Sequence, residues 1–348
     1  MRRQALTCLP LLFTALAACG PTQLAAPPRP AVQDLTVARA PSTLPPEIIE
    51  VRPEQTVYTL STTPDGGARV TTRWTEPGGA GRGLDFVLAG AALDPRAHAL
   101  VLPTGEQLTD SAIAAAMQAA NSPAPGMSVR VRRQGATVAV NAYGGGAAER
   151  QAEVDRIMAA YAAGFDHGVG SAGFRRTGQV GEAHVLQPDH AAIARTQVAL
   201  LAPAAQAVAA ATPGLSARAR IDWLLGFLQS IPYEAPRTGD TPLRLPAGVL
   251  ATNRGDCESK SLAMAALVAA LEPGMTVVMV RRPDHAFLAL GLPPMPGDTV
   301  VTVGGRDLVA AEPVGPGRYE IGRVSPLARA LLLDPSHEVI LLAGATGG

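Results

Sequence analysis

Apolar positions between residues 50 and 143 alternate with polar ones over short stretches, a spacing of two that predicts β-strands. Thr56–Thr62 and Ala68–Trp74 flank the turn sequence Thr-Pro-Asp-Gly-Gly and predict a hairpin. A second hairpin is predicted from Val129–Arg133 and Thr137–Ala142. Further elements predicted in this part are short strands at Phe86–Leu88 and Ala99–Leu102 and a helix from a Thr109 cap to about Ala120. The pattern indicates a small α+β unit.

After Gly144-Gly145-Gly146 the apolar spacing changes to that of helices. Helices are predicted over Ala148–Ala163, Asp189–Ala211 and from a Ser216 cap to about Gln229. Gly168–Gly173 matches G-x-G-x-x-G, but no strand precedes it, so a loop is predicted rather than a dinucleotide site. Ser261–Leu271 is apolar on every face, which predicts a buried helix with Cys257 in its first turn.

The last part of the chain returns to strands, predicted at Met275–Val280, Ala286–Leu290 and Thr299–Val303. A loop is expected over Pro232–Arg254, ahead of the Cys257 helix. The overall expectation is an α+β protein in which the helix bearing Cys257 packs on an antiparallel sheet. Its expected segments are a leader (1–18), a Pro-rich tether (19–47), an N-terminal α+β domain (48–143), a helix with a connecting loop (147–187) and a C-terminal domain (188–348).

The N-terminus has the pattern of a bacterial secretory leader. Arg2 and Arg3 precede the apolar stretch Ala5–Ala18, which is too short to span a bilayer. Leu16-Ala17-Ala18-Cys19-Gly20 resembles the lipobox of bacterial lipoproteins. The resemblance implies lipidation of Cys19 at the mature N-terminus, an anchored protein facing the periplasm, and sorting to the outer membrane in a Gram-negative host. Cys8 would leave with the leader.

Composition narrows the classes of function. The 348 residues carry 29 basic and 29 acidic side chains, with no basic stripe, so a nucleic-acid partner is not expected. Three cysteines cannot form a disulfide scaffold. The histidines outside the Cys257 region show no metal-ligand spacing, so neither a metal nor a cofactor is expected.

Cys257 is the candidate nucleophile. A cysteine at the start of a helix lies beside unsatisfied N–H groups and the positive end of the helix dipole, which favour its thiolate. Downstream, His285 opens one strand and Glu312 follows another, so an imidazole is available to take the thiol proton and a carboxylate to orient the ring. The Cys257 N–H and the amides of Gln229 and Asn253 are candidate oxyanion donors.

Here the sequence resembles a known family. Ile231-Pro232-Tyr233-Glu234, followed by Arg254-Gly255-Asp256-Cys257-Glu258-Ser259-Lys260-Ser261, is similar to the core of bacterial transglutaminase-like proteins, which have a papain-like fold. Asp284-His285-Ala286-Phe287 resembles their histidine strand, and Ala311-Glu312-Pro313 stands where Asp-Pro-Thr is usual. The resemblance covers about residues 189–320. It implies Cys257 as nucleophile, His285 as base and acid, and Glu312 as the orienting carboxylate.

Two departures from the family leave the third residue open. Glutamate is one methylene longer than the usual aspartate, and 27 residues separate His285 from Glu312, so an extra strand must fit between them. Asp307 and Asp298 are the alternatives.

The sequence therefore supports three hypotheses about function. The first is an exported, lipid-anchored cysteine hydrolase or acyltransferase that attacks amide bonds of a peptide, a protein or a cell-wall peptide through a Cys257 thioester. The second is a non-catalytic scaffold or binding lipoprotein of the cell envelope that keeps the same fold. The third is an assembly lipoprotein in which the N-terminal domain carries the function.

Overall fold

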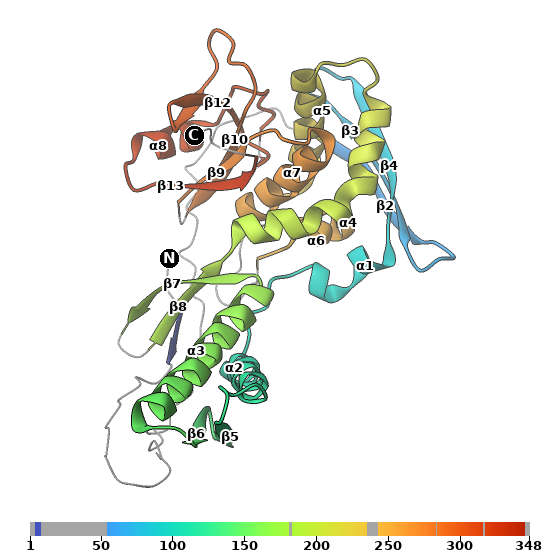
Figure 1. The fold of residues 1–348 in the computed structure, drawn as a ribbon. Coiled ribbons are helices and arrows are strands. Elements are labelled where there is room, and N and C mark those ends of the chain that lie inside the picture. Colours follow the sequence, from blue (N-terminus) through green and yellow to red (C-terminus); the bar gives the residue numbers. More distant parts are fainter. Residues whose placement is uncertain are drawn as a thin grey trace. The chain divides into compact units, whose positions relative to one another are not determined.

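The computed structural model describes residues 4–7, 54–180, 183–234, 243–282, 284–315 and 317–344. Its helices and antiparallel sheets (Figure 1) agree with the α+β expectation. The described residues divide into two compact units, one of 54–101 with those from 190 onward and one of 4–7 with those from 102 to 189. These units differ from the expected segments, because residues 54–101 group with the C-terminal half. The Tyr58 hydroxyl, for example, donates to the carbonyls of Leu250 (2.7 Å) and Ala251 (2.9 Å).

The smaller unit contains two helices, a hairpin and a short sheet. Its core joins both helices to one strand of the hairpin, through Ile113, Val140, Val154 and Ile157. The helices cross closely because Gly164 has no Cβ, which would lie 2.5 Å from the Cβ of Ala115. The elements are α2 (Gly105–Ala120), α3 (Ala147–Ser171), β5 (Ser128–Gln134), β6 (Thr137–Tyr143), β7 (Phe174–Val180), β8 (Ala183–Pro188) and β1 (Gln4–Thr7), which pairs with β8.

Two expectations for this unit were wrong. Helix α2 begins four residues before Thr109, because Thr104 and Gln107 form a reciprocal capping box; Thr109 lies buried inside the helix. The stretch from Gly168 is not a loop, since α3 continues to Ser171 and ends before Gly173, whose φ is +79°. Strands β7 and β8 were not expected. Cys19, the expected lipidation residue, lies outside the described residues, as do Cys8 and most of the expected leader and tether.

The larger unit begins with a three-stranded antiparallel sheet. Its strands, in spatial order, are β2 (Glu54–Thr62), β3 (Ala68–Thr75) and β4 (Gly81–Leu88), so the first predicted hairpin is confirmed. Helix α1 (Gly90–Leu93) and a 3₁₀ turn (Pro95–Ala97) follow. Ala99–Leu102, expected as a strand, forms only a single bridge from Ala99 to Arg244.

Helix α7 (Cys257–Leu271) is the centre of this unit, and every residue from Leu262 to Val268 is buried. It packs against helices α4, α5 and α6 and strand β10 (Figure 1). The absence of a polar stripe in Ser261–Leu271 agrees with burial on all sides. Its helical neighbours are α4 (His190–Ala211), α5 (Ala217–Ser230, capped by Ser216) and α6 (Pro246–Thr252), the last of which lies where only a loop was expected.

A five-stranded antiparallel sheet completes the larger unit in the spatial order β11-β12-β10-β9-β13. Its strands are β9 (Val277–Arg282), β10 (His285–Leu290), β11 (Val300–Val303), β12 (Arg306–Ala311) and β13 (Glu338–Ala343), and α8 (Pro326–Leu333) precedes the last strand. The extra strand expected between His285 and Glu312 is β11. It pairs at the outer edge, which leaves β12 directly beside β10. Among the described residues, no helix has the length and apolar character needed to cross a membrane.

Candidate functional site

The candidate site is built around the first turn of α7. Asp256 is the N-cap, and its carboxylate accepts a hydrogen bond from the Ser259 N–H at 2.9 Å. Cys257 is therefore the first helical residue, as expected; it is buried, with 4% exposure, and forms no disulfide. The position beside the first N–H groups of a helix is electrostatically suited to a thiolate.

Lys260 packs closely against the glycine that precedes Asp256 and Cys257. Its side chain passes beneath Gly255, where a Cβ would lie 3.0 Å from Lys260 Cγ, and its Nζ donates to the Ile231 carbonyl at 2.8 Å. The residue is fully buried, and burial lowers the pKa of the Lys260 amine to about 7. Sequence analysis quoted this residue within the motif but gave it no role.

The two halves of the motif lie side by side. Tyr233 forms a parallel bridge with Gly255, and the Glu234 N–H donates to the Gly255 carbonyl at 3.1 Å. The Glu234 carboxylate pairs with Arg244 at 2.5 Å. The segment Ile231–Glu234 is thus held against the residues that lead into Cys257.

Glu258 anchors the outer side of the same helix turn. Its carboxylate lies 3.1 Å from Arg281 Nε on β9, and Arg281 also pairs with Glu338 at 2.8 Å. The buried ring of His190 lies 3.7 Å from Glu258. Glu258 therefore contributes to the packing of α7 on the sheet.

Strand β10 runs along the same face of α7. The Ser261 hydroxyl lies 3.5 Å from the Ala286 carbonyl. Cys257 is four residues before Ser261, one helical turn away on the same face, and His285 directly precedes Ala286. This pairing brings the start of the helix and the start of the strand to the same end of the interface.

His285 is hydrogen-bonded to Glu312, with 2.8 Å between Nε2 and Oε1. Both residues are buried, at 5% and 2% exposure, although 27 residues separate them in sequence. Ala311 pairs with Leu288, three residues along β10 from His285, so the carboxylate must reach diagonally across the strands. The longer side chain of glutamate suits that reach.

Ser325 completes the surroundings of Glu312 and was missed by sequence analysis. Its hydroxyl donates to Glu312 Oε1 at 2.8 Å and its backbone N–H to Oε2 at 2.6 Å. Ser325 is also the N-cap of α8, so the carboxylate lies at the positive end of that helix. Ser325-Pro326 is a sequence signal for a helix start, but it does not indicate the contact with Glu312.

The two side chains expected as oxyanion donors, Gln229 and Asn253, bind other groups. The Gln229 amide donates to the carbonyls of Glu312 (2.8 Å) and Tyr319 (3.0 Å), which uses both of its N–H groups. Asn253 is the left-handed C-cap of α6 and exchanges amide hydrogen bonds with Gln55. Neither side chain is placed as an oxyanion donor, so the Cys257 N–H is the candidate that remains.

The alternative carboxylates do not contact the imidazole. Asp307 accepts from Thr302 on the exposed side of the sheet, and Asp298 pairs with Arg218 at 2.7 Å. Burial acts to raise the pKa of Asp298, but the hydrogen bonds from Arg218 and the Met295 N–H outweigh it, and the pKa is lowered. The structure therefore brings together His285 and Glu312.

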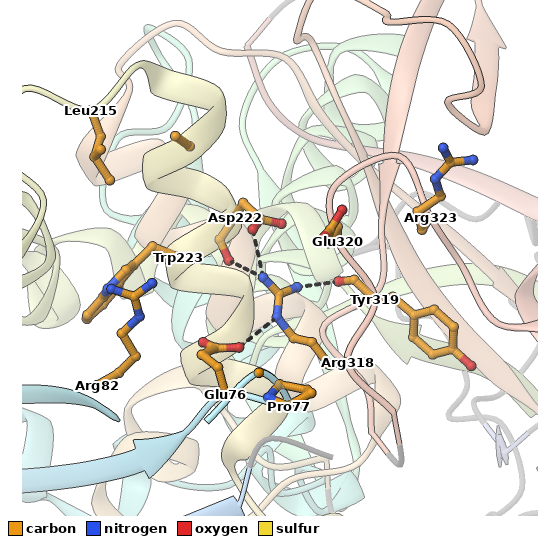
Figure 2. A pocket seen from close by; sticks show the side chains of 12 residues that line it. Glu76, Pro77, Arg82, Leu215, Asp222, Trp223, Arg318, Tyr319, Glu320 and Arg323 are labelled. Carbon is orange, nitrogen blue, oxygen red and sulfur yellow. Dashed lines mark hydrogen bonds and ion pairs between the residues drawn. The ribbon is translucent and has the colours of Figure 1, made fainter. Parts of the chain in front are cut away.

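A cavity of about 910 Å³ lies in the same unit, away from Cys257 and His285. Figure 2 shows Arg318 at its centre, hydrogen-bonded to Glu76, Asp222 and the Tyr319 carbonyl. Arg318 also contacts Gln229 Oε1 at 3.4 Å, and the Gln229 amide bonds to the Glu312 carbonyl. The Gln229 side chain thus connects Arg318 in the cavity wall with the backbone of Glu312 in the candidate site.

The arrangement of thiol helix, imidazole and carboxylate can support nucleophilic attack on a carbonyl without a cofactor. Within the described ranges, no group of three or more His, Cys, Asp or Glu side chains is placed to hold a metal ion. Comparisons with family models, with curated proteins and with solved structures found no match.

Proposed function

We propose that this protein is a cysteine hydrolase or acyltransferase of the transglutaminase-like, papain-like class, acting on amide bonds. The observation that carries the proposal is the buried His285–Glu312 hydrogen bond of 2.8 Å on a strand that packs against the helix beginning at Cys257. A carboxylate bound to one ring nitrogen of a histidine fixes its tautomer and orientation, which a thiol–imidazole pair requires. The motif resemblance supports the same class.

In the proposed reaction, the Nε2–H of His285 donates a hydrogen bond to the Glu312 carboxylate, which leaves Nδ1 to take the proton of the Cys257 thiol. The thiolate attacks the amide carbonyl carbon, and the Cys257 N–H stabilises the negative oxygen of the tetrahedral intermediate. His285 then returns the proton to the departing amine as the C–N bond breaks. Water or a second amine attacks the thioester and releases Cys257.

The substrate class we propose is a peptide or protein amide, including cell-wall peptide. The lipobox-like sequence around Cys19 supports an exported protein anchored by lipid on the periplasmic side of the outer membrane. Removal of the leader would also remove strand β1, which would leave β7 and β8 as a hairpin.

The test is the rate of Cys257 alkylation by iodoacetamide as a function of pH, in wild type and His285→Ala. We expect the wild-type midpoint to lie below about 8.5, the ordinary value for a thiol. The His285→Ala midpoint should return toward it, with a rate at pH 7 roughly tenfold lower or more. Cys257→Ser, which must show no alkylation at this site, is the control. Identical profiles centred near 8.5 in both proteins would contradict the proposal.

A non-catalytic scaffold of the same fold is the second candidate, and the burial of Cys257 favours it, since only 4% of the residue is exposed. An electrophilic probe that forms an acyl-enzyme separates the two. Labelling of wild type under reducing conditions, with none in Cys257→Ser, supports the enzyme. A reduced wild-type protein that alkylates normally but never acylates supports the scaffold.

A further inference from the structure

Lys260 is the only lysine in the chain, and every other basic residue is an arginine. A strong preference for arginine everywhere else makes the single lysine informative, because one position requires an amine. That position is three residues after Cys257, in the first turns of α7. The contacts of the Lys260 amine in the structure indicate why a lysine stands here.

Among the residues that the structure describes, none forms an ion pair with Lys260. Within the described part of the chain, its Nζ makes one hydrogen bond, to the Ile231 carbonyl at 2.8 Å, and no ion pair. The acidic groups on neighbouring turns and segments have other partners. Asp256 caps the Ser259 N–H, Glu258 lies against Arg281 and near His190, and Glu234 pairs with Arg244.

Arginine cannot replace lysine in such a place. A guanidinium keeps its charge and five donors under all ordinary conditions, and a single carbonyl cannot satisfy them in a sealed site. A buried amine can lose its proton and remain a hydrogen-bond donor. Its direction also suits a brace, because helical side chains lean toward the N-terminus, here toward Gly255 and Cys257.

We propose that Lys260 is a positioning residue of the candidate site, which holds the Ile231 carbonyl and thereby keeps Ile231–Glu234 against Gly255 beside the Cys257 thiol. The expected effect on the reactivity of Cys257 rests on the proposed function. The bracing of the two chain segments does not, and it can be measured without any substrate.

The first experiment compares Lys260→Met, which keeps the apolar volume, with Lys260→Arg. Two quantities are measured: hydrogen exchange of the Glu234 amide, which bonds to the Gly255 carbonyl, and the rate of Cys257 alkylation at pH 7. In Lys260→Met we expect exchange of the Glu234 amide to become about tenfold faster and alkylation of Cys257 to become about tenfold slower. Both follow because the segment Ile231–Glu234 is no longer held beside the thiol. Unfolding by urea should show that the variant remains as stable as wild type or more so.

Lys260→Arg should be less stable than Lys260→Met, although it is the conservative change by charge. The brace is refuted if Lys260→Met leaves both Glu234 exchange and alkylation unchanged. The argument about the amine is refuted if Lys260→Arg is as stable as wild type. If Lys260→Met shows the expected changes but His285→Ala leaves the alkylation of Cys257 unchanged, the proposed function alone is refuted.

A measurement on wild type avoids any dependence on variants. Because the chain has one lysine, incorporation of ¹³Cε-lysine gives a single side-chain resonance. Its midpoint should lie well below the ordinary value of about 10.4. A midpoint at that ordinary value would show a solvated ammonium group and overturn the inference.

Discussion

Two polar clusters of the larger unit are built on opposite principles. Around Arg318, one guanidinium meets the two carboxylates of Glu76 and Asp222 at the wall of an open cavity. In the candidate site, a buried amine has no carboxylate partner among the described residues, and the buried carboxylate of Glu312 is bound by an imidazole and by Ser325. The first cluster joins segments by charge, and the second by hydrogen bonds among groups that can exchange protons.

The difference shows which groups determine stability and which are available for chemistry. A charge with paired, fixed partners stabilises the fold but cannot transfer a proton at neutral pH. A buried group whose charge is uncompensated costs folding free energy, and proton transfer lowers that cost. The cluster that is less favourable for stability is therefore the one for which we propose catalysis.

The largest expected effect tests the uncompensated amine. Burial lowers the pKa of Lys260 to about 7, whereas in the unfolded chain a lysine titrates near 10.4. Between these values the unfolded chain binds the additional proton, so the unfolding free energy of wild type rises with pH. Relative to Lys260→Met, wild type should gain about 3–4 kcal/mol between pH 7 and pH 10.

Urea titrations at pH 7, 8.5 and 10 measure this gain as the difference between the two proteins. Lys260→Met has no lysine, and its arginines do not titrate in this range, so it is the matched reference. A difference that stays constant with pH would show that the amine is not sealed from water.

The second prediction concerns the compensated cluster. Arg318→Met leaves the carboxylates of Glu76 and Asp222 without their shared cation, and the Arg318 side chain is only 11% exposed. We expect a loss of about 2–4 kcal/mol in the free energy of unfolding. Raising the salt concentration should recover little of it, because the pairs are largely buried.

A smaller effect on stability is expected for Ser325, which donates hydrogen bonds to Glu312. Ser325→Ala removes the hydroxyl that donates to Glu312 and caps α8, which should cost about 1–2 kcal/mol of unfolding free energy. The same change should slow alkylation of Cys257 at pH 7, since the carboxylate that orients His285 loses a donor. Ser325→Thr keeps the hydroxyl and should restore both quantities. If Ser325→Ala lowers stability without changing the pH profile of alkylation, Ser325 is only a helix cap.

The smallest effect is expected at the rim of the cavity. Arg82 lines the cavity on an exposed part of β4 (Figure 2) and forms no ion pair in the described structure. Arg82→Ala should change the unfolding free energy by less than about 0.5 kcal/mol. Measured beside Arg318→Met, it separates the charge that is fixed in the wall from the charge that is solvated. Equal effects of the two substitutions would remove the distinction.

Local patterns were sufficient for much of the site. The helix with Cys257 in its first turn was predicted from an apolar run, and the strand of His285 from a short β-type run. The hairpins β2–β3 and β5–β6 were predicted from alternation around turn residues. In each case the decisive interactions join residues close in sequence, so the signal lies in one window of the chain.

Other features could not be predicted from any single stretch of the sequence. Ser325 lies beside Glu312, and the Lys260 amine beside Ile231, only because separate elements pack together. Gln229 was a candidate donor until its amide was found on the carbonyls of Glu312 and Tyr319. The start of α2 was misplaced because Thr104 competed with Thr109 as a cap, and the Gln107 partner decided in favour of Thr104.

The sequence by itself determined which residues could carry the chemistry: a thiol at a helix start, an imidazole on a strand and a set of three carboxylates. Tertiary structure decided among the carboxylates, because the pairing of β12 with β10 brings Glu312, and neither Asp298 nor Asp307, within 2.8 Å of His285. It also decided that the Lys260 amine is buried against the Ile231 carbonyl. Hydrogen-bond partners across 27 or 29 residues depend on strand register and helix packing, which no local pattern specifies.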